Sequence, residues 1–166
     1  MYSKILVPLD GSKLAEGVLP HVQELAQRFD SQVTLIQVVA PLSKLVAETV
    51  PASLEPSGAA AAVGLEAAAE AVKAERESAR AYLEGVAERL KAEKIRVQVG
   101  VVEGTAGDAI VDYGHRHGMD IIAMSTHGRS GLLRLVYGSV ADHVLRHAGT
   151  PVLLIRSRQA EEQPGN

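Results

Sequence analysis

Small and polar residues gather in one stretch of the C-terminal half of the chain. Residues 125–131 read Ser-Thr-His-Gly-Arg-Ser-Gly, and Gly138-Ser139 follows at the head of a helical pattern. The stretch comes directly after the apolar run 121–124, which is typical of a buried strand. Glycines let backbone N–H groups approach an anion closely, and the first N–H groups of a helix add unpaired donors. A strand, a glycine-rich loop and a helix start in this order hold phosphate, so the sequence predicts a nucleotide-binding protein.

Two common phosphate-binding motifs are missing from the chain. There is no G-x-x-x-x-G-K-[ST] segment, which excludes a P-loop enzyme. The turn after the first apolar run, from Asp10 to Ser12, holds a single glycine and no G-x-G-x-x-G, which disfavours a dinucleotide site. The loop that follows residue 124 is therefore the phosphate site that the sequence favours.

Composition places the chain among soluble globular domains. Its 166 residues suit one domain, and 46% of them are hydrophobic and 22% charged. A formal net charge of −3, without a basic stripe, and only 3% aromatic residues argue against a nucleic-acid partner. The absence of cysteine excludes disulfides and thiolate chemistry. The first apolar run is too short for a signal peptide or a membrane anchor, so we expect a cytoplasmic protein without a membrane partner.

Hydrophobic periodicity divides the chain into alternating strands and helices. The predicted strands cover residues 5–9, 32–39, 95–102, 121–124 and 151–156. The predicted helices cover residues 15–29, 65–94, 109–117 and 138–147. Pro20 interrupts the first helix well inside its pattern, so we expect a kink or a distorted turn there. The third helix should begin with a capping box that involves Thr105 and Asp108.

Two segments fall outside this alternation. Residues 40–64 contain several prolines and form an irregular insertion, in which residues 44–49 favour a short helix. Residues 157–166 are polar and form a C-terminal tail. The sequence thus predicts one nucleotide-binding domain over residues 1–156, followed by the tail.

Five strands that alternate with four helices predict an α/β fold, a doubly wound five-stranded parallel sheet with helices on both faces. The long first half and the short second half of the chain favour the strand order 3-2-1-4-5, with winding reversed between the first and fourth strands. Ligands of such sheets bind outside the carboxyl ends of the strands at this reversal. Leu9–Ser12 and Ser125–Ser139 meet there, so two separate signals point to one crevice.

The chain resembles the universal stress protein family, whose nucleotide-binding members carry G-x2-G-x9-G-[S/T]. Here the motif reads Ser125-x2-Gly128-x9-Gly138-Ser139. The resemblance covers almost the whole chain, from the opening Ile5–Ser12 to the closing Thr150–Ile155. It implies a regulatory module of the stress response that binds ATP with Mg²⁺. It also implies a homodimer through strand 151–156, and the apolar residues of this edge strand favour the same pairing.

The family pattern implies roles for individual residues. Asp10 would face the ribose or the phosphate-bound metal, although a helix N-cap would use the same side chain. The backbone of Val38 would meet the adenine. Gly128 and Arg129 would offer backbone N–H groups to the phosphates, and Ser139 would add a hydroxyl. The other residues expected at the nucleotide site are Pro8, Leu9, Met124, Ser125, His127, Gly131, Gly138 and Val140.

Ser125 departs from the family pattern, because it stands where the motif has its first glycine. If the position needs only a small side chain, serine fits and adds a hydroxyl donor near the phosphates. If it needs a positive φ, serine is strained by about 1 kcal/mol or more. The sequence leaves both alternatives open.

Histidines supply further candidates. His127 lies in the glycine-rich loop, where it would donate to phosphate, act as a base or brace the loop. His143 and His147 have a spacing that can bind a metal ion, but the sequence shows no third ligand. His115 and His117 are expected at a solvated helix end.

Three functions stay open from the sequence. The first is the nucleotide-dependent regulatory module, the second is a slow ATP hydrolase, and the third is a structural dimer with an empty crevice. No P-loop lysine, arginine finger or second acidic cluster is visible for phosphoryl transfer. We therefore assign no catalytic residue and favour the module.

Overall fold

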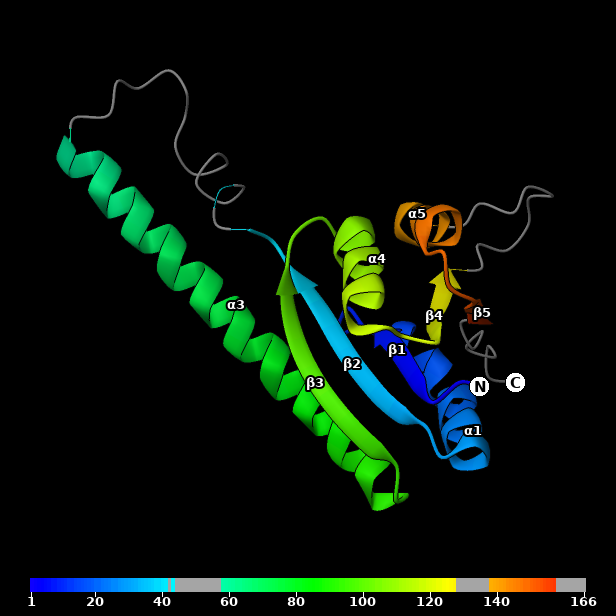
Figure 1. Cartoon of the computed structure of the whole chain (residues 1–166). Coiled ribbons are helices and arrows are strands. Elements are labelled where there is room, and N and C mark those ends of the chain that lie inside the picture. Colours follow the sequence, from blue (N-terminus) through cyan, green and yellow to red (C-terminus); the bar gives the residue numbers. More distant parts are fainter. Residues whose placement is uncertain (42, 44–57, 128–137, 158–166) are drawn as a thin grey trace, which may run out of the picture.

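The computed structural model describes residues 1–41, 43, 58–127 and 138–157, with the backbone alone at 58–62, 127 and 157. The strands are β1 Lys4–Pro8, β2 Gln32–Val39, β3 Arg96–Glu103, β4 Ile121–His127 and β5 Val152–Ser157. The helices are the 3-10 helix η1 Ala15–Val18 and the α-helices α1 Leu19–Phe29, α3 Gly58–Ala92, α4 Ala106–His117 and α5 Ser139–His147. The strands form one parallel sheet in the order β3-β2-β1-β4-β5, which confirms the predicted α/β fold and strand order (Figure 1).

Helices cover both faces of the sheet, because successive side chains of each strand point to opposite sides. On β1, Ile5 and Val7 belong to the core under α1 and α3, whereas Leu6 belongs to the core under α4 and α5. All three side chains are fully buried. The helices complete the first core with Val18, Val22, Leu83, Val86 and Leu90, and the second with Ile110, Val111, Ala141, Val144 and Ala148. The prediction of helices on both faces is confirmed.

Pro20 lies at the start of a helix and not in its interior. Residues 15–18 form the 3-10 turn η1, and α1 begins at Leu19 with the proline in its first turn. The first N–H groups of an α-helix have no partner within the helix, so a residue without N–H is tolerated there. The predicted distorted turn is therefore confirmed, whereas one continuous helix over residues 15–29 was wrong.

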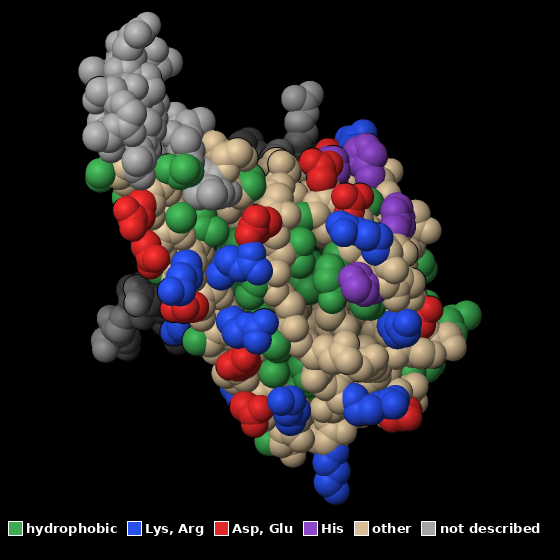
Figure 2. Space-filling view, turned by 60° about the vertical axis from the view of Figure 1, so that its left-hand side comes forward, with side chains coloured by type: hydrophobic (Ala, Val, Ile, Leu, Met, Phe, Trp, Pro, Cys, Tyr) green, Lys and Arg blue, Asp and Glu red, His purple; other side chains and the backbone are tan. Residues whose placement is uncertain are grey.

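The helix α3 begins earlier than the sequence predicted. It starts at Gly58, so residues 58–64 are helical and do not belong to an irregular insertion. The predicted short helix at residues 44–49 lies outside the described residues. Buried positions recur along α3 every three or four residues from Ala79 to Leu90, the part that packs on β3 and β2. Its other side is exposed and carries lysine, arginine and glutamate side chains side by side (Figure 2).

The strand β4 is longer than predicted, because it runs to His127. Residues 125–127 were predicted as loop, but they continue the strand and pair with residues 155–157 of β5. The pairing partner is distant in sequence, and this is why local periodicity ended the strand at residue 124.

Among the described residues, no helix is long and apolar enough to cross a membrane.

Candidate functional site

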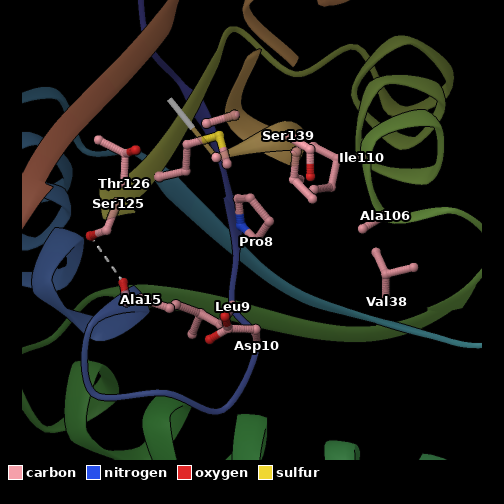
Figure 3. Close-up of a pocket in the computed structure, with 14 residues that line it drawn as sticks. Pro8, Leu9, Asp10, Ala15, Val38, Ala106, Ile110, Ser125, Thr126 and Ser139 are labelled. Carbon is pink, nitrogen blue, oxygen red and sulfur yellow. Dashed lines mark hydrogen bonds between the residues drawn. The ribbon is translucent and has the colours of Figure 1, made fainter. Parts of the chain in front are cut away.

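A hollow of about 290 Å³ opens at the carboxyl ends of β1 and β4, close to the lower limit of ~300 Å³ for ligand pockets. It lies at the predicted reversal of winding, where β1 and β4 are neighbours (Figure 3). All predicted site residues whose side chains are described line it, namely Pro8, Leu9, Asp10, Val38, Met124, Ser125, Gly138, Ser139 and Val140. The sequence did not single out the other lining residues, which are Ala15, Ala106, Ile110, Thr126 and Ala141.

Other predicted site residues cannot be placed. Gly128, Arg129 and Gly131 lie outside the described residues. His127 is the last residue of β4, and only its backbone is described. The described part of the site is formed by the strand ends, the turn after β1 and the first turns of α4 and α5.

The turn after β1 presents Asp10 to the pocket. Its Oδ1 accepts a hydrogen bond from the Ser12 N–H at 2.9 Å, and Gly11 has a φ of 84°, which favours glycine. A different side chain bonds the start of η1: Ser12 Oγ accepts a hydrogen bond from the Ala15 N–H at 3.0 Å. The helix-cap alternative for Asp10 is therefore wrong. An exposed carboxylate that accepts one N–H keeps acceptor sites for a hydroxyl or a cation.

The N-terminus of α5 offers backbone donors to the same pocket. Gly138 is the N-cap residue and has no side chain that could bond the first turn. Pairing within the helix begins with the Asp142 N–H, which donates to the Gly138 carbonyl at 3.0 Å. The N–H groups of Ser139 and Val140 precede it and have no acceptor within the helix. The helix start is thus suited to an anion.

The Ser125 side chain faces the turn after β1. Its backbone lies in β4 and its φ is not positive, so the alternative of a strained serine is excluded. The Ser125 Oγ donates to the Ala15 carbonyl at 3.2 Å (Figure 3). In this structure the hydroxyl binds the protein backbone, which the sequence could not reveal because the two residues are far apart in the chain.

Most of the remaining wall of the pocket is apolar, and Thr126 adds a hydroxyl. Val38 comes from the end of β2, and Ala106 and Ile110 come from the first two turns of α4 (Figure 3). The two alanines at positions 15 and 106 leave room for a ligand at the starts of η1 and α4. The pocket therefore combines an apolar lining with the Asp10 carboxylate and the start of α5.

The histidines on α5 bind α4 and each other. His143 Nε2 lies 2.9 Å from Asp108 Oδ1, and the His147 ring stacks on the His143 ring with 4.3 Å between centroids. Thr105 makes no side-chain cap, so the predicted capping box was wrong and Asp108 pairs with His143. In the described part of the chain, no group of three or more histidine or acidic residues could hold a metal ion.

The histidines on α4 also have partners. His115 Nε2 lies 2.6 Å from the Ala148 carbonyl, and the His117 ring stacks on Tyr113 with 4.1 Å between centroids. The expectation of a solvated helix end is confirmed, because both residues are exposed, and the structure adds a partner for each ring. The His115 contact joins the end of α4 to Ala148, the residue after α5, away from the pocket-lining residues at the helix starts.

Known proteins resemble the chain over almost its full length. A model of the universal stress protein family matches residues 1–156. Universal stress protein MJ0531 of Methanocaldococcus jannaschii is 30% identical over 163 residues, 97% of this chain and 86% of the relative. The solved structure of MJ0577 from the same organism has a TM-score of 0.74 at 27% identity and covers 96% of this chain and 99% of that chain.

A more distant solved structure shows the same fold. It is a universal stress protein family member from Arabidopsis thaliana with AMP bound. The TM-score is 0.61 at 17% identity, and the match covers 99% of this chain and 97% of that chain.

Proposed function

The chain belongs to the universal stress protein family, and from this premise we propose that it binds ATP with Mg²⁺ in the pocket between β1 and β4. The nucleotide acts as a bound signal that changes the contacts of a regulatory module in the stress response. The proposal takes residues 1–156 as the nucleotide-binding domain, residues 157–166 as its tail, and the cytoplasm as its location.

One juxtaposition carries the proposal. The Asp10 carboxylate and the start of α5, whose first N–H groups lack helical partners, line the same pocket. A carboxylate repels phosphate unless a cation lies between them, whereas the helix start attracts phosphate. ATP bound to Mg²⁺ satisfies both groups, because the cation meets Asp10 and the phosphates meet Ser139 and Val140.

The apolar lining of the pocket suits the base. Val38, Ala106 and Ile110 form an apolar wall on which adenine would pack, and the ribose would lie between this wall and Asp10. The Arabidopsis family member with bound AMP supports an adenine nucleotide as the ligand class. A few charge-assisted hydrogen bonds at about 1.5–3 kcal/mol each, together with base burial, are sufficient for micromolar binding, which is roughly −8 kcal/mol.

We also propose that two copies of the chain pair through β5. Within the described sheet, β5 has β4 as its neighbour on one side and an open edge on the other. Leu153 and Ile155 pack on the α1 and α3 side, and Val152 and Leu154 pack on the opposite side. A strand that is apolar on both faces and open along its edge favours pairing with another strand.

The ligand class can be tested by the change in melting temperature on adding nucleotide. ATP with Mg²⁺ should raise the melting temperature more than GTP with Mg²⁺ does, and more than ATP with a chelator does. Asp10→Asn should remove most of the Mg²⁺-dependent part of the increase and leave the effect of adenosine unchanged. No increase with any adenine nucleotide would contradict the proposed function.

A further inference from the structure

The hydrogen bond from Ser125 to Ala15 joins two segments that wall the pocket. Ser125 is a residue of β4, and Ala15 is the first residue of η1. The Ser125 side chain points to the same face of the sheet as Ala123, which packs in the core with α1 and α3. The bond therefore reaches from the sheet to the turn that carries Asp10.

A second set of bonds holds η1 from the opposite side. Glu16 follows Ala15, and its carboxylate accepts from Tyr82 Oη at 3.2 Å and from an Arg89 guanidinium nitrogen at 2.6 Å. Both donors belong to α3. The 3-10 turn is thus held between β4 and the long helix, and Ala15 is the part of it that lines the pocket.

The hydroxyl of a serine has a single hydrogen to donate. While Ser125 donates it to the Ala15 carbonyl, it does not donate to a phosphate oxygen. A glycine at this position, as in the family motif, could not make the bond at all. The serine therefore gives this chain a contact that the motif does not supply.

We propose that Ser125 is a positioning residue, which fixes η1 and the turn of residues 10–15 against β4 and does not bind the phosphates. The inference rests on the proposed function, because it concerns the wall of the nucleotide pocket. Loss of the bond loosens the wall that faces the whole ligand. Binding of adenosine and of ATP then weakens by the same factor, about three- to tenfold, the effect of one neutral hydrogen bond.

The experiment uses the full chain with Ser125→Ala and Ser125→Thr, since threonine keeps the hydroxyl and suits a strand. Amide hydrogen exchange of the ligand-free protein reports on the wall. We expect faster exchange at residues 15–18 in Ser125→Ala, unchanged exchange in α3, and wild-type exchange in Ser125→Thr. Unchanged exchange at residues 15–18 in Ser125→Ala would overturn the proposal.

Calorimetry with adenosine and with ATP separates positioning from direct contact. Ser125→Ala should weaken both ligands equally, whereas Ser139→Ala, at the start of α5, should weaken ATP alone. If Ser125→Ala weakens ATP and leaves adenosine unchanged, the hydroxyl binds phosphate and the proposal is wrong. If the wild type binds neither ligand, the proposed function fails, while the exchange experiment still decides whether Ser125 holds η1.

Discussion

The imidazole of His143 on α5 rests directly against the backbone of Gly107 on α4. A β-carbon built on Gly107 would lie 2.7 Å from His143 Cδ2 and 2.8 Å from its Cγ, closer than such atoms can approach. His143 is also held by Asp108, in the same turn of α4. This contact between the two helices follows Ala106 directly and lies one turn after Ser139, and both of these residues line the pocket.

Replacing Gly107 by alanine should destabilise the protein by about 1–3 kcal/mol, because the added carbon forces the two helices apart. The direction of this change is informative, because replacing glycine by alanine within a helix ordinarily stabilises a protein by roughly 0.5–1 kcal/mol. Gly85→Ala is the matched control, because a β-carbon there has no neighbour within 4 Å in the described part of the chain. Urea unfolding of both variants measures the effect.

The loss of stability in Gly107→Ala should depend on the ring of His143. In a His143→Ala background the added carbon has room, so Gly107→Ala should then change the free energy of unfolding little. A Gly107→Ala protein as stable as the wild type would show that the contact between α4 and α5 is not tight.

The stability of the protein should fall at high pH because of Tyr82. Burial of its hydroxyl, together with the Glu16 carboxylate, raises the pKa of Tyr82 above the ordinary value of 10.0. The raised pKa contributes stability below pH 10, and this contribution is lost as pH rises and the unfolded chain ionises first. Tyr82→Phe should therefore show a smaller fall in the free energy of unfolding between pH 8 and about pH 11 than the wild type.

Tyrosine absorbance at 295 nm gives an independent check on Tyr82. The wild type should show a larger late-titrating component than Tyr82→Phe, in which Tyr113, whose pKa burial also raises, still titrates late. The absorbance change that disappears in Tyr82→Phe belongs to Tyr82. If its midpoint lies at or below pH 10, the raised pKa of Tyr82 is contradicted.

Pairing of two copies through β5 should make the protein a dimer at micromolar concentration. Sedimentation should then give twice the chain mass of 17.5 kDa. Leu153→Lys should shift the protein toward the monomer, because the charge lies beside the open strand edge. Leu65→Lys, on the exposed part of α3, is the control and should remain dimeric. A monomeric wild type would rule the pairing out, and circular dichroism checks that Leu153→Lys remains folded.

Bound ATP should turn over more slowly than about 1 s⁻¹, the lower range of ordinary enzymes. The donors at the start of α5 hold the phosphates in the ground state as well as the transition state, and uniform binding does not accelerate a reaction. A single-turnover assay with excess protein measures the rate. A faster rate that collapses in Asp10→Ala or His127→Ala would establish a hydrolase.

Local patterns were sufficient to predict the sheet and the place of the pocket. Alternating apolar segments indicated the order of the elements, and the reversal of winding predicted that Leu9–Ser12 and Ser125–Ser139 meet at one crevice. Pro20 marked a distorted turn for a local reason, the missing N–H of proline.

The contacts that the sequence could not predict join residues far apart in the chain. Asp108 looked like part of a capping box, but it pairs with His143 on the neighbouring helix. The Ser125 hydroxyl looked free to meet phosphate, but it donates to the carbonyl of Ala15 in η1. Neither partner can be read from spacing, because each depends on how separate elements pack together.

Calorimetric titration of ATP with Mg²⁺ into the wild type and into Gly138→Val tests the central claim most directly. Gly138 lines the pocket, its φ of −56° suits valine, and a β-carbon there meets none of the described residues within 4 Å, so the variant should fold and yet block the start of α5. We predict micromolar binding by the wild type, at least about tenfold weaker binding by Gly138→Val, a difference of ~1.4 kcal/mol or more, and unchanged binding by the control Gly85→Val. Equal affinity of wild type and Gly138→Val, or no binding by the wild type, would contradict the account.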